Sequence, residues 1–306
     1  MVDLDQLEAL DTLLWMRGSP VAAKATFATQ STIIRRSRQA LHTFGVTLKR
    51  GHNTWQTSEN SILLNLERRV HQEARFHGYR RLRLHMPWWT TSLLDPDLNV
   101  QVAKRWIVHP HSVRIREDDP VSLLKDRVID ACVVTPTQMP AVDPELCAMD
   151  LYHSDIHLME LTDDRSPMLF EYHEVGGCRL RLLDFLPHSC RIASRAWFDG
   201  HVGLEQLDVN ELAAFRKSVD FAYLTPSMAQ ASGITARPNC SSPRPYVERL
   251  VVREECQNHP DVQQLMSMLS DCFGRRGSSD QTGDITILSP MQHLHGALPG
   301  MEAFLS

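Results

Sequence analysis

The sequence contains no Cys-x-x-Cys pair, although it has seven cysteines in 306 residues. This absence argues against a zinc site or a disulfide framework and favours reduced, mostly buried thiols. His109 with His111 and His293 with His295 form two His-x-His pairs, but neither is joined by a second ligand pair at a familiar spacing. We therefore expect surface or loop histidines, no bound metal and no cofactor.

The sequence also lacks an apolar run of the ~18 residues that a membrane helix needs, and its acidic N-terminus has no basic segment followed by an apolar core. We therefore expect a cytoplasmic protein with no membrane partner. Gly-rich phosphate loops, Gly-x-Ser-x-Gly elbows and His-Glu-x-x-His motifs are absent too. Nothing in the sequence indicates an enzyme.

Acidic residues are missing from one long stretch of the chain. The composition, with 42% hydrophobic and 23% charged residues, is typical of a folded protein, and the length suits two or three packed units. The net charge is −5, yet positions 12–58 carry seven Lys or Arg residues and no Asp or Glu. This stretch is suited to an anionic partner.

The first sixty residues predict three helices followed by a β-hairpin. Leucines at positions 4, 7, 10 and 14 recur at helical spacing, and Pro20 suits the first turn of a short second helix. A third helix is expected from Gln30, capped by Thr29 or Ser31, and positions 46–57 predict a short β wing. The residues expected on the apolar face of the third helix are Ile33, Ile34, Ser37, Leu41 and Phe44.

This order of elements is typical of a winged helix-turn-helix, in which the last helix enters the major groove of DNA. Arginine binds phosphate or guanine with two parallel hydrogen bonds, and polar side chains near the helix start reach base edges. The alternative is an ordinary three-helix bundle with a solvated basic face. The candidate DNA-binding residues are Gln30, Ser31, Thr32, Arg35, Arg36, Arg50 and His52.

Residues 1–60 resemble, without a gap, the winged helix-turn-helix of the LysR-type transcriptional regulators. The matching positions are Ala22, Ala23, Gln30, Arg35, Gly45, Leu48 and Thr57. The positions that depart from the family are Thr26, Ile34, Ser37, Ala40, Leu41 and Lys49, where it usually has Leu, Ser, Ile, Leu, Glu and Phe. The resemblance implies binding of double-stranded DNA.

Positions 58–78 predict a linker helix with an apolar seam formed by Leu63, Leu66, Val70 and Ala74. Pairing with the same helix of a second copy would cover this seam, which predicts a homodimer or homotetramer. Packing of the seam onto its own chain is the alternative. In the LysR-type resemblance this segment is the dimerising helix.

Positions 79–273 predict a two-lobed α/β domain of the periplasmic-binding-protein type. The first block has expected strands at 80–86, 112–116 and 130–135, with helices after Trp89 and at 119–128. The second block has expected strands at 190–193, 220–224 and 248–253, with helices at 210–217, 226–230 and 259–273. This part resembles the effector domain of LysR-type regulators, most clearly at 219–230. Positions 274–306 predict a flexible tail, of which 285–288 could dock on a lobe.

Hydroxyls beside helix N-termini, with one arginine as counter-charge, suit a carboxylate effector, and tryptophans suit an aromatic one. The alternative for the tryptophans is packing within a lobe. The candidate effector-binding residues follow the ends of expected strands, and the layout that the LysR-type resemblance implies places an effector there. They are Trp88, Trp89, Thr90, Thr91, Thr135, Thr137, Ser194, Arg195 and Thr225.

The sequence therefore predicts an N-terminal all-α/winged-helix domain at 1–57, a linker helix at 58–78, an α/β effector-binding domain at 79–273 and a tail at 274–306. The predicted function is that of a LysR-type DNA-binding transcriptional regulator whose sensor domain binds a small-molecule effector. The alternative is a regulator-derived interaction protein that no longer reads DNA and acts through partner binding.

Overall fold

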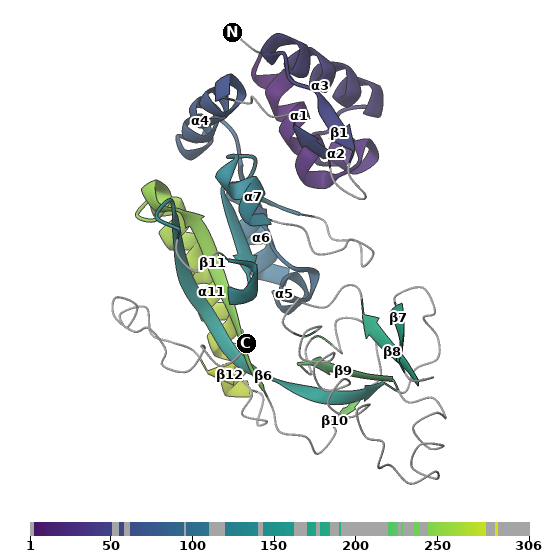
Figure 1. Ribbon diagram of the computed structural model, residues 1–306. Coiled ribbons are helices and arrows are strands. Elements are labelled where there is room, and N and C mark those ends of the chain that lie inside the picture. Colours follow the sequence, from purple (N-terminus) through teal and green to yellow (C-terminus); the bar gives the residue numbers. More distant parts are fainter. Residues whose placement is uncertain are drawn as a thin grey trace.

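The computed structural model describes residues 3–50, 55–57, 62–94, 96–109, 120–139, 143–161, 170–175, 178–183, 190, 220–225, 228, 236–238, 244–279 and 285–286. These residues form a mixed α/β structure, with three helices at the top, α4 beside them and a twisted sheet below (Figure 1). No helix within the described ranges is long and apolar enough to cross a membrane.

The three predicted N-terminal helices and the hairpin are present. They are α1 (Leu4–Met16), α2 (Ser19–Ala25), α3 (Gln30–Phe44), and the antiparallel strands β1 (Leu48–Arg50) and β2 (Trp55–Thr57). Pro20 lies in the first turn of α2, where a missing N–H costs no hydrogen bond. Gly45 ends α3 with φ 64°, a left-handed conformation that glycine adopts without strain.

The apolar faces of α1 and α3 differ from the expectation. In α3, Ile33 is buried, but Ile34 remains 36% exposed and faces outward, so its predicted burial is wrong. Successive helical side chains are ~100° apart, so only one of two neighbouring isoleucines can point into the core. In α1, all side chains from Ala9 to Met16 are buried, because α1 shares a core with the α/β part as well as with α3.

The first block of the α/β part has the predicted parallel β-α-β-α-β order. It consists of β3 (Leu82–His85), α5 (Trp88–Leu93), α6 (Pro96–Arg105), β4 (Trp106–Val108), α7 (Pro120–Lys125) and β5 (Ala131–Val134). Strand β3 lies between β4 and β5 and is parallel to both. The second strand of this order is β4, the apolar run directly after α6, and the predicted strand at 112–116 lies outside the described residues.

Two long strands extend the sheet. Strand β6 (Leu146–Leu161) is antiparallel to β11 (Arg244–Arg253), and its far end pairs with β9 (Asp220–Leu224) and β10 (Ala236–Pro238) (Figure 1). A separate hairpin joins β7 (Phe170–Val175) to β8 (Cys178–Leu183). The sequence predicted β9 and most of β11, but not β6 or the hairpin.

Two predictions for the C-terminal half need correction. Cys190 is helical, and not the start of a strand; positions 191–193 and 210–217 lie outside the described residues. Helix α11 (Pro260–Ser279) continues six residues beyond the predicted end at Phe273. The expected tail therefore begins as a helix, and its residues 285–286 form strand β12, which pairs with β6.

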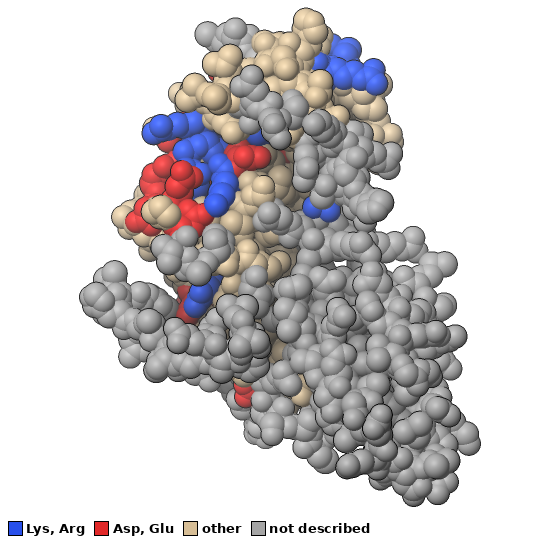
Figure 2. Space-filling model, viewed as in Figure 1, with Lys and Arg blue, Asp and Glu red and all other residues tan. Residues whose placement is uncertain are grey.

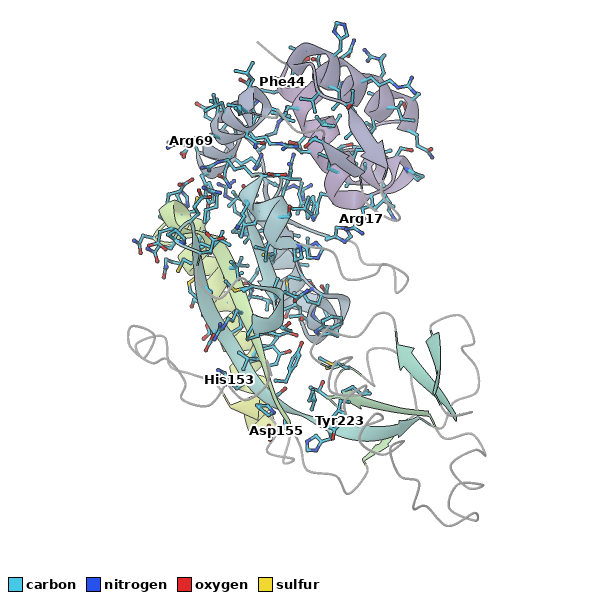
Figure 3. All side chains as sticks on the ribbon, in the orientation of Figure 1. Arg17, Phe44, Arg69, His153, Asp155 and Tyr223 are labelled. Atoms are coloured by element: carbon cyan, nitrogen blue, oxygen red, sulfur yellow. The ribbon has the colours of Figure 1, made fainter. Side chains whose placement is uncertain are left out.

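A buried ionic network joins the N-terminal helices to the sheet through α4 (Ile62–Phe76). Arg68 contacts Asp11 of α1 at 2.8 Å, and Arg75 contacts Asp130, beside β5, also at 2.8 Å. Arg83 of β3 contacts Glu8 of α1 at 2.6 Å. In Figure 3 Arg69, on the outer side of α4, points away from this junction.

His109 lies in a loop directly after β4, as expected for the histidines, but it is not on the surface, since it is 1% exposed. Its Nε2 atom lies 3.2 Å from the carbonyl oxygen of Trp15, whose indole N–H donates to His85 at 3.4 Å. Burial lowers the pKa of His109 to about 4, because the site disfavours the charged imidazolium. The ring is therefore part of the contact between α1 and the sheet.

We expect the Arg75→Ala and Asp130→Ala variants each to lose about 3 to 5 kcal/mol of unfolding free energy, because each leaves a buried charge without its partner. Urea denaturation of the full chain measures this loss. As a control, Lys125→Ala removes an ion pair with Asp143 in which the lysine side chain is 43% exposed, and it should cost less than about 1 kcal/mol. Equal effects of the three substitutions would contradict the assigned role of the network.

Candidate nucleic-acid interface

The start of α3 is held by Thr29. Its hydroxyl oxygen accepts a hydrogen bond from the backbone N–H of Thr32 at 3.2 Å, and it lies 3.0 Å from the Ser31 hydroxyl and 2.9 Å from the Thr32 hydroxyl. Of the two capping residues predicted, Thr29 is the one used. Gln30 and Ser31 remain exposed, and Thr32 is half-buried. The helix N-terminus, with its partial positive charge, therefore presents polar side chains outward.

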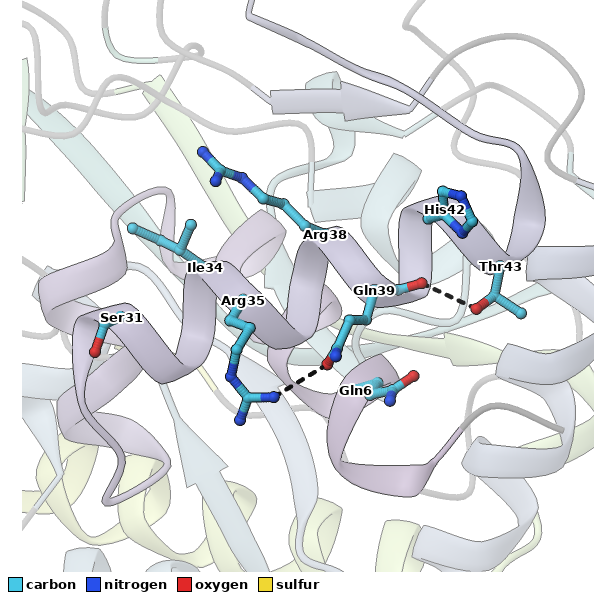
Figure 4. Close-up of a pocket in the computed structure, with 8 residues that line it drawn as sticks. All are labelled: Gln6, Ser31, Ile34, Arg35, Arg38, Gln39, His42 and Thr43. Atoms are coloured by element: carbon cyan, nitrogen blue, oxygen red, sulfur yellow. Dashed lines mark hydrogen bonds between the residues drawn. The ribbon is translucent and has the colours of Figure 1, made fainter.

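The outward face of α3 forms one side of an open groove of about 880 Å³ (Figure 4). Its lining residues are Gln6, Ser31, Ile34, Arg35, Arg38, Gln39, His42 and Thr43. Arg35 donates to the side-chain oxygen of Gln39 at 3.4 Å, while Arg38 projects from another side of the helix (Figure 4). The groove contains cationic and amide side chains but no carboxylate among the described residues that line it.

The three arginines of α3 are not equivalent. Arg35 and Arg38 are exposed, but Arg36 is 32% exposed and forms an ion pair with Asp5 of α1 at 2.8 Å. Asp5 also contacts Arg80 at 3.1 Å. The outward position is therefore shared by Arg35 and Arg38. The candidate DNA-binding residues predicted from the sequence did not include Arg38, Gln39 or His42, which line the groove.

The distribution of charge agrees with this division. Figure 2 shows a group of Lys and Arg side chains over the N-terminal helices at the upper right, with no acidic side chain among them. At the left of the same view, acidic and basic side chains are intermixed. Of the two candidates in the wing, Arg50 ends β1 with its side chain outside the described residues, and His52 lies wholly outside them.

Most of the described effector candidates bond within the protein. Trp89 and Thr90 are 6% and 0% exposed, and each donates a hydrogen bond of 2.6 Å to the carboxylate of Glu248. The hydroxyl of Thr91 donates to the carbonyl of Pro87 at 3.1 Å, one helical turn earlier. These donors are therefore already used, which supports the packing alternative for Trp89.

Thr135 and Thr225 are buried at chain turns. The hydroxyl of Thr135 donates to the side-chain oxygen of Gln138 at 3.2 Å and thereby starts a short 3₁₀ helix (Pro136–Gln138). The hydroxyl oxygen of Thr225 accepts from the backbone N–H of Met228 at 3.1 Å. The remaining candidates are Trp88 and Thr137, whose side chains are outside the described residues, and Ser194 and Arg195, which are wholly outside them.

Glu248 is a residue that the sequence analysis missed. It is 0% exposed in β11 and accepts hydrogen bonds from Trp89, Thr90 and the phenol of Tyr246, each at 2.6 Å. Burial raises the pKa of Glu248, and the hydrogen bonds from these donors oppose that shift without cancelling it. A glutamate in a strand carries no local signal of such an environment, because its donors come from another part of the chain.

No protein-family model and no curated protein matches the chain. Similar solved structures include the probable transcriptional regulator PA0477 from Pseudomonas aeruginosa, with 16% identity and a TM-score of 0.42 over 88% of this chain and 96% of that one. Full-length OxyR C199D from Pseudomonas aeruginosa has 13% identity and a TM-score of 0.41, over 89% and 97% of the two chains. Full-length CbnR complexed with its target DNA has 15% identity and a TM-score of 0.40, over 88% and 99%.

These similar structures are LysR-type regulators.

We expect Glu248→Ala to lose at least about 3 kcal/mol of unfolding free energy, because several buried donors lose their acceptor. Glu248→Gln keeps one acceptor oxygen and should cost less.

The raised pKa of Glu248 means that the folded state holds a proton more tightly than the unfolded state. The stability that this proton contributes is complete below the pKa of the unfolded state and is lost as pH rises through the pKa of the folded state. The stability difference between wild type and Glu248→Gln should therefore shrink as pH rises. Urea denaturation across about pH 4 to 8 measures it; exposed Glu254→Gln is the control.

Proposed function

We propose that the protein is a LysR-type transcriptional regulator that acts in the cytoplasm and binds double-stranded DNA through the outward face of α3. The observation that carries this proposal is the pair of exposed arginines, Arg35 and Arg38, on a capped helix whose open groove has no carboxylate among its described lining residues. An α-helix fits the major groove of B-DNA, where arginine binds guanine with two hydrogen bonds.

Each part of the α3 face has a chemical role in this proposal. Arg35 and Arg38 bind guanine edges or phosphates, and Gln39 binds adenine with its amide. At the helix start, Gln30 and Ser31 lie beside free backbone N–H groups that favour a phosphate oxygen. Arg50 and His52 in the wing contribute further backbone contacts. The domain division 1–57, 58–78, 79–273 and 274–306 belongs to the same proposal.

We also propose that two copies pair through α4. This helix buries charged and polar side chains, among them Arg68 and Arg75, and exposes apolar ones. The exposed residues are Ile62 at 69%, Leu63 at 65%, Leu66 at 56% and Val70 at 61%. Such an apolar stripe in water is covered when the same helix of a second copy packs against it, which places two α3 helices on one DNA molecule.

The α/β part is proposed to bind a small-molecule effector and to perform no catalysis. Since Trp89 and Thr90 bind Glu248, the remaining candidates for a carboxylate or aromatic effector are Trp88, Thr137, Ser194 and Arg195. Thr91, Thr135 and Thr225 use their hydroxyls in local turns. Effector binding would change the spacing of the two DNA-reading units in the dimer.

The α3 proposal predicts unequal effects for its arginines. Arg35→Ala and Arg38→Ala should each weaken binding to the selected DNA site by about 1 to 3 kcal/mol if the residue binds guanine. Arg36→Ala should cost less, because Arg36 already pairs with Asp5. Gel-shift titrations measure these affinities, using sites that the full chain selects from a random duplex library.

Lys125→Ala is the control of matched charge, since Lys125 lies on α7 and pairs with Asp143. Unchanged affinity in both the Arg35 and Arg38 variants would assign DNA binding to another surface. Selection of no DNA at any salt concentration would contradict the proposed function and favour partner binding instead.

The α4 proposal predicts that Leu66→Glu or Val70→Glu separates the dimer, because each places a charge in the proposed apolar contact. Analytical ultracentrifugation should show monomers for these variants and dimers or larger species for wild type. Arg69→Glu, also on the surface of α4, is the control for a general effect of negative charge. A wild-type monomer at micromolar concentration would contradict the pairing.

A further inference from the structure

A second basic surface lies on the segment that leads from α4 into the sheet. It is an open groove of about 600 Å³. The described residues that line it include no Asp or Glu; they are Phe76, His77, Gly78, Tyr79, Arg80, Arg81, Lys104 and Arg105. We call this surface the junction groove. In a chain of net charge −5, four Lys or Arg side chains without a lining acid indicate an anionic partner.

The junction groove is held in shape by Arg105. Its guanidinium donates to the carbonyl oxygens of Arg75, Phe76 and Arg80 at 2.7, 2.9 and 2.9 Å, and its Nε donates to Asp261 at 2.7 Å. Arg105 therefore fixes the backbone of the turn, and its own charge is balanced by Asp261. The exposed cations that remain for a partner include Arg81 and Lys104.

The junction groove lies near the side of α3 that carries Arg36, next to the proposed DNA face of Arg35 and Arg38. Arg80 and Arg81 also line a smaller cleft of about 190 Å³, together with Arg36 of α3 and the acidic residues Asp5 and Glu8 of α1. Asp5 bridges the two surfaces, since it contacts Arg36 at 2.8 Å and Arg80 at 3.1 Å. The ion pairs of Asp5 thus connect α3 to the turn that carries Arg80 and Arg81, and the junction groove begins on the far side of that turn.

Resting on the DNA binding proposed above, we propose that the junction groove binds the sugar-phosphate backbone of the DNA that flanks the site read by α3. Arg81 and Lys104 neutralise phosphates there, in the part of the chain predicted to be the effector domain. Such contacts lengthen the bound DNA and raise affinity, but they carry no base discrimination.

The shape of the groove favours a long polyanion over a small one. Small-molecule sites enclose most of their ligand, whereas the junction groove is open to solvent and shares Arg80 and Arg81 with the cleft beside α3. A duplex bound at α3 has an evenly charged backbone on either side of the helix, so its flanks supply phosphates to an adjoining basic surface without a second molecule.

The test uses the full chain, its selected DNA site and the double variant Arg81→Ala with Lys104→Ala, which leaves the Arg105 contacts and the Arg80–Asp5 pair in place. We expect the slope of log affinity against log salt to become less steep by about 1 to 2, since each phosphate contact contributes about 0.9. The protected footprint should shorten on one side of each half-site. Trimming the flanking DNA should weaken wild type but not the double variant, and discrimination against a mutated site should stay unchanged.

Lys125→Ala with Arg249→Ala is the matched control, because it removes two positive charges from α7 and β11, at the ion pairs with Asp143 and Asp150. This control should keep the wild-type salt slope and footprint. Arg35→Ala should instead reduce discrimination between the selected and the mutated site.

The outcomes separate the two proposals. If the Arg81 and Lys104 variant keeps the wild-type slope, footprint and flank dependence while Arg35→Ala loses binding, the junction-groove proposal is overturned and the proposed function stands. If the variant loses binding of inorganic polyphosphate but keeps the wild-type flank dependence, the groove binds a free polyanion and the proposal is again overturned. If wild type binds no DNA, both proposals fail.

Discussion

The buried carboxylate of Asp130 is the point on which the arrangement of this protein depends. It receives hydrogen bonds from both the Nε and a terminal nitrogen of Arg75, from the amide of Gln72 and from the backbone N–H of Arg83, at 2.8 to 3.1 Å. A buried charge is tolerated only when it is paired and hydrogen-bonded, and loss of one partner is costly. This single group therefore fixes α4 against the sheet.

The orientation of α4 follows from that contact and has two consequences. Because the polar face of α4 with Arg68 and Arg75 turns inward, the apolar face turns to solvent, which is the reverse of an ordinary amphipathic helix. Because α1 joins the same network through Asp11 and Glu8, α3 is held close to the turn that carries Arg80. The buried ionic network therefore positions both the proposed dimer surface on α4 and the junction groove.

Local patterns predicted a large part of the fold. The spacing of apolar residues predicted α1, α3 and most of α11, and the β-α-β-α-β order predicted a parallel sheet, since these signals depend on neighbours in the chain. Strand β6 was not predicted, because it alternates weakly and pairs with strands from four other segments. On α3, Arg35 was expected on the exposed face and is exposed, whereas Ile34 was expected to be buried and is exposed, and Arg38 was not among the candidates.

The sequence by itself determined that a basic segment free of acid forms helices beside an α/β unit, because charge content and periodicity are properties of consecutive residues. The tertiary structure alone decided which charged side chains are paired within the protein and which remain exposed to bind a partner. Asp5 forms ion pairs with Arg36 and with Arg80, which is 75 positions away in the sequence. Glu248 accepts a hydrogen bond from Trp89, which is 159 positions away. The residues next to an ionic group in the sequence do not indicate a partner that lies so far along the chain. Once folding brings the two charges within a few ångströms, their attraction decides whether the side chain is exposed or paired.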